Sequence, residues 1–406
     1  MVSHFDVSII IVNYNGKKYF KDLFDSFLTL KASDISYEII VVDNNSIDDS
    51  ITYLKNNYEA RIKNLKILNP GQNLGFAGGN NYGVKHANGE YIVFLNNDTR
   101  VEPDWLYNLY HGIKTSGAGI VSSKLVFFYD YLKVQVKTTD KLMLSTNITI
   151  NGEPYRVDPK FCTNLLYEKD RLVCFGHTVF YIPVIDLEQG QTVVFDVIQH
   201  TENDRLVIGD VEKEVSEELG STFIFNKNTI QTLKRTLVQN AGSGIDENYN
   251  GYDIGFCQED QGQFSERTLI NNACGAAMMM LKTDFDDVQG FDEYFFMYYE
   301  DTDLSYKIRE KGKTIVYIPD SIVRHIHTGS SKEWSPFFVY HVYRNRLLFI
   351  FKHFSTQIYL KQWIKYILHV GKSVLLTSET KELKVAKAKA FIHALLQLPR
   401  YIKSKR

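Results

Sequence analysis

The 406-residue sequence lacks most features that would place a protein in a membrane or cross-link it covalently. Its four cysteines form no CxxC pair and have no zinc-ligand spacing, so we expect reduced core thiols in an intracellular protein. No apolar run reaches the roughly 18 residues that a membrane span requires. A strand-like run begins within a few residues of the N-terminus, so no secretory signal is expected. These absences argue against a disulfide scaffold, a zinc module and a membrane-spanning protein.

The common phosphate-loop templates are also missing. Residues 71–83, GQNLGFAGGNNYG, hold five glycines and four Asn or Gln residues, but the spacing is not GxGxxG and no GKS/T sequence is present. Glycines let a backbone approach a ligand closely. A generic glycine-rich segment is more typical of a plain turn, so its chemistry depends on the motifs around it.

What the sequence does contain is ordinary for a globular protein, with 44% hydrophobic and 23% charged residues. The length suits one large domain or two modest ones. The net charge of −2 conceals an asymmetry, because residues 361–406 carry a net charge of +9 and the remainder −11. A basic tail on an acidic body favours a polyanionic partner surface, anionic lipid before nucleic acid.

Four apolar runs alternate with helical patterns in the first hundred residues, and each run ends in polar side chains. The runs are VSIIIV (7–12), EIIVVD (38–43), LKIL (65–68) and YIVFL (91–95). Continuous apolar runs of this length are typical of buried parallel strands. The pattern predicts a doubly wound α/β sheet, which binds ligands at the carboxyl ends of its strands.

From about residue 125 the pattern changes. Residues 125–235 are rich in Val, Thr, Tyr and Phe in short alternating runs, which predicts an inserted, mostly antiparallel β module. After about residue 270 we expect a buried strand at 273–281, a helix at 301–311, and two strands within TIVYIPDSIVRHIH. From residue 336 onward the pattern predicts helices, the last of them basic and amphipathic.

Two acidic residues follow predicted strands directly. Asp43 closes the second strand, where a carboxylate can accept hydrogen bonds from a nucleotide base or ribose, or can take part in a helix N-cap. Asp98 follows the fourth strand within Asn96-Asn97-Asp98-Thr99. It can hold a divalent metal that neutralises a diphosphate leaving group, or it can belong to a capped turn.

Two further groups of ionisable residues lie in the second half of the chain. Glu300, Asp301 and Asp303 follow the aromatic stretch FFMYY (295–299). They suit a general base that takes a proton from a hydroxyl, and equally the first turn of a helix. His325 and His327 are spaced so that both face one side of a predicted strand, which is a metal-site pattern.

Taken in order, these motifs resemble the family-2 inverting glycosyltransferases, and more narrowly the rhamnosyltransferase-like branch of bacterial surface-polysaccharide enzymes. The motifs are VSIIIVNYNG, IIVVDNNSIDDS, NLGFAGGNNYG, YIVFLNNDT, GAAMMMLKTDFDDVQGFDEYFFMYYEDTDLSYKIREKG and VRHIHTGSS. The resemblance covers residues 1–125 and 237–350. It implies a GT-A fold, a nucleotide-sugar donor and a divalent metal, Mn²⁺ or Mg²⁺.

The resemblance also implies roles for individual residues. Asp301, in the pair with Glu300, matches the catalytic base. Asp98 and His325 match metal ligands, and His327 competes with His325 for that role. The residues expected at the donor are Asn15, Asp43, Asn45, Asn73, Gly75, Phe76, Gly78, Gly79, Asn80, Asn96 and Asn97. Asn96 stands at the first position of a DxD-type motif, which leaves a single strong anionic ligand.

The implied reaction is a single displacement. Asp301 takes a proton from an acceptor hydroxyl, whose oxygen attacks the anomeric carbon opposite the diphosphate, so the configuration inverts. The expected organisation is a catalytic domain at 1–125 and 237–335, a β-rich module at 126–236 and a helical basic tail at 336–406. Phe296, Tyr298, Tyr299 and Trp334 are candidates for an acceptor wall or for core.

The resemblance favours dTDP-rhamnose as donor, with UDP-hexoses open, and a glycan or lipid-linked acceptor. We expect a cytoplasmic enzyme, peripheral at the inner face of the cell membrane through its basic tail, with no nucleic acid partner and with self-association through the β module as one option. One rival is a nucleotidyltransferase, although the loop after the first strand, NYNGKKYF, argues against it. The other rival is an inactive glycan-binding or scaffolding protein on the same fold.

Overall fold

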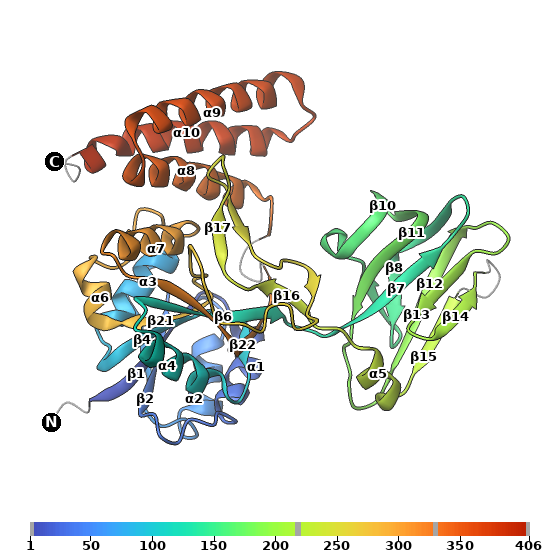
Figure 1. The fold of residues 1–406 in the computed structure, drawn as a ribbon, viewed down its shortest axis with the longest axis horizontal. Helices are drawn as coiled ribbons and strands as arrows, with labels where there is room; N and C mark the ends of the chain where they lie inside the picture. The colour runs from blue at the N-terminus through green and yellow to red at the C-terminus, as the bar shows by residue number, and fades with distance from the viewer. Residues whose placement is uncertain (1–3, 216–220, 328–331, 403–406) are drawn as a thin grey trace. The chain divides into compact units, whose positions relative to one another are not determined.

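The computed structural model describes residues 4–215, 221–327 and 332–402. The chain divides into two compact units (Figure 1). The first unit comprises Met1–Val126, Gln239–Gly255 and Gln263–Arg406, and the second comprises Phe127–Val238 and Phe256–Gly262. Two short strands, β16 (Leu237–Asn240) and β19 (Gln258–Glu259), lie near the points in the sequence where the chain passes from one unit to the other.

The first unit is built on a mixed sheet whose central strand order is β6-β21-β4-β1-β2-β3. Strands β1, β2, β3 and β4 run parallel, and β21 is antiparallel to β4 and β6. The strands of this sheet within the unit are β1 (Phe5–Asn13), β2 (Tyr37–Asp43), β3 (Leu65–Leu68), β4 (Gly89–Leu95), β5 (Thr99–Val101), β6 (Ile120–Phe127), β20 (Thr268–Leu269), β21 (Ala277–Leu281) and β22 (Ile315–His325). Two further strands, β17 (Ser243–Ile245) and β18 (Gly251–Asp253), pair with each other in a separate hairpin. The predicted runs at 7–12, 38–43, 65–68 and 91–95 are therefore confirmed as strands.

Helices cover both faces of this sheet, which confirms the doubly wound arrangement. The helices of this unit are α1 (Lys17–Phe27), α2 (Ser50–Tyr58), α3 (Gly75–Val84), α4 (Trp105–Ser116), α6 (Lys282–Asp287), α7 (Glu300–Glu310), α8 (Pro336–His353), α9 (Thr356–Leu376) and α10 (Lys381–Ile402), and the last three form a separate layer. On β1, Ile9 and Ile11 point into one core with α1, α2 and α4. The alternate residues Ile10 and Val12 face α3 on the other side. Alternation along a buried strand thus supplies two apolar faces.

Helix α3 corrects the expectation of a turn or loop at residues 71–83. Its glycines permit a close approach to the sheet, because a Cβ on Gly83 would lie 2.5 Å from Ile10 Cγ2 and a Cβ on Gly79 would lie 2.9 Å from Val12 Cγ1. Glycine normally weakens a helix interior. Here tertiary packing against β1 overrides that propensity.

Two other sequence expectations need correction. TIVYIPDSIVRHIH forms one strand, β22, and not two, because Pro319 is accommodated within a strand that continues to His325. Only Ala277–Leu281 of the predicted strand at 273–281 is a strand, since the preceding residues form the turn that leads into it.

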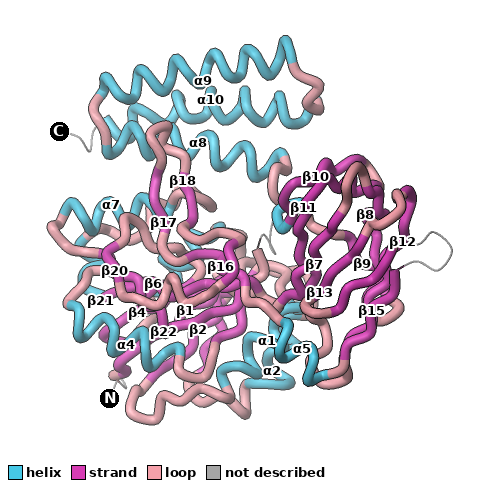
Figure 2. The backbone as a smooth tube through the Cα atoms, turned by 45° about the vertical axis from the view of Figure 1, so that its right-hand side comes forward, coloured by secondary structure: helices cyan, strands magenta, loops and turns pink. Residues whose placement is uncertain are grey.

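The C-terminal helices α8, α9 and α10 pack on one another and share a core with residues Phe295 and Tyr299 (Figures 1 and 2). Ser335 caps α8 by accepting a hydrogen bond from Phe338 N at 3.2 Å, and Ser355 caps α9 in the same way. No helix in the described part of the chain is both long enough and apolar enough to cross a membrane.

The second unit is a nine-stranded sheet whose pairings are antiparallel, as predicted for the inserted module. Its main order is β14-β13-β7-β11-β8-β12-β15. Its elements are β7 (Tyr131–Lys137), β8 (Leu142–Ile150), β9 (Glu153–Arg156), a 3₁₀ turn (Pro159–Phe161), β10 (Cys162–Glu168), β11 (Arg171–Pro183), β12 (Gln191–Gln199), β13 (Arg205–Ile208), β14 (Val211–Glu214), β15 (Ser221–Phe225) and α5 (Lys227–Leu233). Inward residues of these strands form a separate apolar core.

Candidate active site

Asn13, at the end of β1, connects the carboxyl ends of three strands. Its Nδ2 donates to Asp43 Oδ1 at 3.3 Å and to Ser46 Oγ at 3.0 Å, and its Oδ1 accepts from Asn97 Nδ2 at 3.0 Å. Asn13 is fully buried. It holds the predicted donor residues Asp43 and Asn97 at one edge of the sheet. Its role is not apparent from the local sequence, in which the signal for it is its place at the end of a strand.

The loops after β1 and β2 are tied together by Asn15. Its backbone N donates to Ser46 Oγ at 2.9 Å, and its side-chain Oδ1 accepts from Ile47 N at 2.8 Å. Asn45, also predicted at the donor, is exposed and has a positive φ of 63°. Helix α2 begins only at Ser50, after an N-cap at Asp49, so Asp43 does not cap it.

Asp98 and His325 are 227 positions apart in the chain but meet because β5 pairs with β22. The register sets His325 opposite Thr99, the residue after Asp98. His325 Nε2 lies 3.1 Å from Asp98 Oδ1 and 3.2 Å from Asn96 Nδ2. His327 lies two residues past the end of the strand, so the expected alternation of strand faces does not reach it.

The side chains at this point fit a divalent cation. Gln239 Oε1, a pure acceptor, lies 3.0 Å from His325 Nδ1, which assigns the imidazole proton to Nδ1 and leaves a lone pair on Nε2. Asp98 Oδ1 is buried and accepts no hydrogen bond within the described residues. One carboxylate with one imidazole suits a metal completed by phosphate oxygens and water. No cluster of three His, Cys, Asp or Glu ligands occurs in the described ranges.

The predicted donor segment 73–80 leads into α3 and packs on the aromatic stretch. Asn73 Oδ1 accepts from Gly75 N at 2.9 Å, and Phe76 N donates to Phe296 O at 2.7 Å. Gly75 has a φ of 69°, and a Cβ there would lie 2.5 Å from the Phe296 ring. Only glycine fits both constraints. Asn80 is buried and donates to Phe76 O at 2.9 Å, within its own helix.

Asp301 lies in the first turn of α7, and two backbone amides hold its carboxylate. Its Oδ2 accepts from Gly275 N at 2.9 Å, and its Oδ1 accepts from Thr302 N at 2.7 Å. Burial raises the pKa of Asp301, although these hydrogen bonds oppose the shift. Burial and the charge of Asp301 raise the pKa of Glu300 well above its usual range, and Glu300 Oε2 accepts no hydrogen bond within the described residues. An oriented carboxylate with a raised pKa suits a general base.

Two neighbouring residues connect this carboxylate to the metal-ligand strand. Gly275 N donates to Asp301, while Ala276 O accepts from Asn96 N at 3.0 Å. A Cβ on Gly275 would lie 3.1 Å from Phe76 and 3.3 Å from Asp301 Cβ. The segment before β21 therefore brings the donor segment, the metal motif and the candidate base to one edge of the sheet.

The aromatic stretch before α7 has an unusual backbone. Phe296, Tyr298 and Tyr299 have φ values of 63°, 70° and 70°, a region that bulky residues rarely adopt. Asn345 of α8 stabilises it by donating to the carbonyl oxygens of Phe295, Met297 and Tyr298 at 2.7–2.9 Å. Of the aromatic candidates, Tyr299 is buried and Trp334 is 64% exposed.

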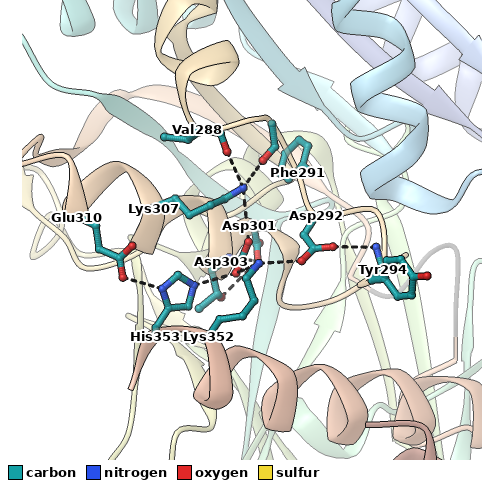
Figure 3. Close-up of polar contacts among 12 residues, drawn as sticks. Val288, Phe291, Asp292, Tyr294, Asp301, Asp303, Lys307, Glu310, Lys352 and His353 are labelled. Atoms are coloured by element: carbon teal, nitrogen blue, oxygen red, sulfur yellow. Dashed lines mark hydrogen bonds and ion pairs between the residues drawn. The ribbon is translucent and has the colours of Figure 1, made fainter. Parts of the chain in front are cut away.

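A buried ionic network fixes α7 against α8 (Figure 3). Asp303 is fully buried, and its Oδ1 lies 2.6 Å from Lys352 Nζ and 2.8 Å from His353 Nε2. Lys352 also contacts Asp292 Oδ2 at 2.8 Å. Burial opposes ionisation of Asp303, but the hydrogen bond from His353 and the charges of Lys352 and Lys307 lower its pKa below the usual range. Asp303 thus holds in place the helix that carries Asp301.

Asp253, on β18, is a site residue that sequence reasoning missed. Its Oδ1 accepts from Asn240 Nδ2 at 2.6 Å and from Ser243 Oγ at 2.9 Å. Burial raises the pKa of Asp253, and so does the charge of Asp301, whereas His325 lowers it. Asp253 therefore lies within electrostatic reach of both the candidate base Asp301 and His325, the predicted metal ligand. No local motif marks it, because its relevance arises from the folding of the β17–β18 hairpin.

Comparison with known proteins agrees with this geometry. Residues 8–177 match the model of the family described as Glycosyl transferase family 2. This part of the chain is therefore similar to the glycosyl transferase family 2 domain. The match supports the resemblance drawn from the sequence at the level of the family, whereas the rhamnosyltransferase-like branch is not tested by it.

Two curated relatives of this domain have named activities. The chain is 32% identical over 120 residues to a poly(ribitol-phosphate) beta-glucosyltransferase of Bacillus spizizenii, covering 29% of this chain and 19% of that protein. It is 28% identical over 137 residues to a cholesterol galactosyltransferase of Borreliella burgdorferi, covering 34% and 37% respectively. The matched segment thus spans less than two fifths of either relative.

A solved structure shows the fold of the domain. GalNAc-T7 with UDP, GalNAc and Mn²⁺ superposes with a TM-score of 0.53 at 14% sequence identity, covering 100% of this chain and 58% of that one. The likeness confirms the GT-A fold that the sequence predicted.

Proposed function

We propose that this protein is an inverting, metal-dependent glycosyltransferase that moves a sugar from a nucleotide-diphosphate donor to a hydroxyl of a glycan or lipid-linked acceptor in cell-surface polysaccharide synthesis. The observation that carries the proposal is the link through Gly275 and Ala276. It joins the buried, amide-held carboxylate of Asp301 to the strand end that bears Asp98 and His325. A base and a leaving-group site at one sheet edge are what a single displacement requires.

In this proposal Asp301 accepts the proton of the acceptor hydroxyl as its oxygen attacks the anomeric carbon. The amides of Gly275 and Thr302 orient the carboxylate, and Asp303 with Lys352 holds the helix on which it lies. The donor lies along the ends of β1, β2 and β4 and the start of α3. Asp98 and His325 would hold a divalent cation, which supplies neutralisation of the diphosphate leaving group when bound.

The donor sugar remains a choice between two groups of nucleotides. The resemblance to rhamnosyltransferase-like enzymes favours dTDP-rhamnose. The names of the relatives concern glucosyl and galactosyl transfer, and the structural relative was solved with UDP, which supports UDP-hexoses as the other group. A donor screen must therefore include both groups.

The decisive experiment measures donor binding and turnover separately for a panel of UDP-, GDP- and dTDP-sugars, with and without Mn²⁺. We expect one donor to bind in a metal-dependent way, and Asp98→Ala to lose that binding. Asp301→Asn should keep donor binding and lose about 10²–10⁴-fold in turnover, the usual contribution of a general base. Asp104→Asn, an exposed position before α4, is the matched control and should change neither quantity.

The anomeric configuration of the product tests whether the transfer inverts. NMR of the anomeric proton should show a configuration opposite to that of the donor. Retention would overturn the single displacement. If no nucleotide sugar binds under any condition, the transferase assignment fails, and an inactive glycan-binding protein becomes the better description, to be tested on an oligosaccharide array.

The C-terminal helices support a second element of the proposal, docking on anionic lipid. Helices α9 and α10 expose many large apolar side chains beside their lysines. They are Leu360, Ile364, Ile367, Leu368, Val374, Leu375, Leu376, Val385, Ile392, Leu396 and Ile402. Apolar side chains bordered by lysines suit a bilayer interface with anionic headgroups.

Cosedimentation with vesicles tests this docking. Vesicles containing phosphatidylserine should bind the protein at low salt and release it at high salt, and neutral phosphatidylcholine vesicles should bind less. Leu368→Gln with Leu396→Gln should weaken binding without loss of fold. Equal behaviour with both vesicle types, or a concentration-dependent dimer that buries the same face, would overturn the assignment to lipid.

A further inference from the structure

A cavity of about 190 Å³ lies between the turn of the β17–β18 hairpin and helices α8 and α9. It is separate from the residues assigned above to the donor, the metal and the base. Its lining includes Asn248 from the turn, Tyr343 and Arg346 from α8, and Lys365 and His369 from α9. The space is far larger than one water molecule needs, and it suits a small polar group with some of its hydration.

The cations that line this cavity have only weak partners. Arg346 donates to Asn250 Oδ1, and Lys365 Nζ donates to Asn248 Oδ1 at 2.8 Å. Within the described residues, neither cation has a carboxylate within 4.0 Å. Amide oxygens from a surface turn satisfy these groups less well than an anion would, because charge-assisted hydrogen bonds are roughly twice as strong as neutral ones.

A neutral amide also lines the cavity. Gln362 is only 8% exposed as a residue, and its side chain forms no hydrogen bond within the described part of the chain. Its amide is not among the fully enclosed polar atoms, so solvent in the cavity reaches it and a ligand there can replace that water. Its NH₂ group can donate to an oxygen held between Arg346 and Lys365.

The neighbouring charges leave an excess of positive charge. Lys387 lies 5.9 Å from the Tyr343 ring, but it is paired with Glu379 at 2.7 Å. Asp246 accepts from the backbone N of Asn248 and of Asn250 at 2.8 Å, and its charge offsets part of that of Arg346 from a longer distance. Burial lowers the pKa of His369, and Lys387, Arg346 and Lys372 lower it further, while Glu379 opposes the shift.

We propose that this cavity is a binding site for a phosphate group. Arg346 offers a planar fork that matches two phosphate oxygens, Lys365 offers a point charge, and Gln362 offers an amide donor. The phosphate can belong to a phosphodiester of the acceptor or to the headgroup of an anionic lipid, and the chemistry of recognition is the same for both. Phosphate binding itself does not depend on the proposed function, whereas its use for an acceptor does.

The β17–β18 hairpin gives the cavity a connection to the active site. Its turn contacts Arg346 and Lys365, and its last strand ends at Asp253, which lies within electrostatic reach of Asp301. Tyr299, directly before Glu300, donates its hydroxyl to Tyr249 O at 2.8 Å. A phosphate that takes over the cations would release Asn248 and Asn250 at one end of a hairpin whose other end faces the candidate base.

The test is a titration of the full-length protein with inorganic phosphate, followed by NMR of the His369 imidazole. Bound phosphate should raise the pKa of His369 in a saturable way, because an anion stabilises the imidazolium. Arg346→Gln should weaken phosphate binding about tenfold or more, as expected for the loss of one charge-assisted contact. Lys361→Gln, four residues before Lys365 on the same helix and outside the cavity lining, should leave the affinity unchanged.

Separate arms distinguish the source of the phosphate. A soluble glycerol phosphodiester that competes with inorganic phosphate, while phosphatidic acid vesicles do not, assigns the site to an acceptor, and the reverse result assigns it to lipid. Absence of a saturable His369 shift, or equal weakening by Lys361→Gln, would overturn the proposal. Arg346→Lys, which keeps the charge, should bind more tightly than Arg346→Gln if the latter is folded. Binding of the nucleotide-sugar donor should be measured in parallel. If the donor binds but phosphate does not, the phosphate site is wrong while the transferase assignment stands.

Discussion

The two units of this chain treat buried polar groups differently. In the β unit, Asp130 accepts from Lys234 Nζ at 2.9 Å and from Thr236 Oγ1 at 2.8 Å, and Glu259 accepts from Lys133 Nζ at 2.7 Å and from Tyr181 Oη at 2.6 Å. In the other unit, Asp98 Oδ1 and Glu300 Oε2 are buried without a hydrogen bond from the described residues. The two unsatisfied oxygens belong to residues of the candidate site, where a ligand can supply the partner, whereas the carboxylates of the β unit already have theirs.

The largest effect on stability is expected from Asp303→Asn, within the unit that carries the candidate site. The change removes one of the two carboxylates that contact Lys352, and also the carboxylate that contacts His353, and breaking such a buried network costs about 3–5 kcal/mol. We expect the free energy of unfolding, measured with urea, to fall by that amount, together with kcat, because α7 is no longer held. A variant as stable as the wild type would show that the network does not position α7.

Asp303 also makes a pH prediction. Its folded-state pKa is lowered, so its contribution is present above the unfolded-state value of about 4 and is lost as the pH falls through the depressed value. Urea unfolding between pH 2 and pH 5 should show stability rising with pH up to about pH 4. The slope should be smaller in Asp303→Asn. Equal slopes in both proteins would contradict the assignment.

Asp130→Asn tests the β unit in the same way. The substitution weakens the hydrogen bond that Lys234 Nζ donates to residue 130. The free energy of unfolding should fall by about 1–3 kcal/mol, because partly buried Lys234 loses its charged partner. Since the β unit contributes no residue to the proposed catalytic site, the kcat of the folded fraction should not change. A loss of kcat at full folding would break the distinction between the two units.

Two glycine substitutions compare a tightly packed helix, α3 against the sheet, with an open helix surface on α9. Gly83→Ala places a Cβ 2.5 Å from Ile10 Cγ2 and should destabilise the protein by about 1–3 kcal/mol, offset in part by helix propensity. Gly371→Ala, within α9, has no atom within 4 Å of the new Cβ and should stabilise by about 1 kcal/mol. Thermal unfolding of both variants measures the contrast. Stabilisation of both would show that α3 can move away from the sheet.

The smallest expected effect is a shift of the pH profile in Asp253→Asn. The charges of Asp253 and Asp301 repel each other, so removing one should lower the pKa of the base. The acid limb of kcat/KM should then move to lower pH by less than about one unit. Glu247→Gln, an exposed residue on the same hairpin, is the control. A limb that moves equally in both variants would indicate a general charge effect.

Much of the fold could be read from local patterns. The runs at 7–12, 38–43, 65–68 and 91–95 became parallel strands because continuous apolar residues suit burial on both faces. The alternating runs of 125–235 became an antiparallel sheet, because alternation lets each strand bury one face and expose the other. The placement of Asp43, Asp98 and Asp301 at strand and helix ends also followed from the sequence, since such ends are where a buried element meets solvent.

What only the tertiary structure decided depends on partners distant in the chain. His325 reaches Asp98 through the β5–β22 register, and Asp253 reaches Asp301 through a hairpin that no motif marks. Residues 75–84 form a helix because β1 packs against their glycines, although local propensity favoured a turn. Local sequence determines the period and polarity of an element, whereas desolvation and register arise only when remote elements pack together.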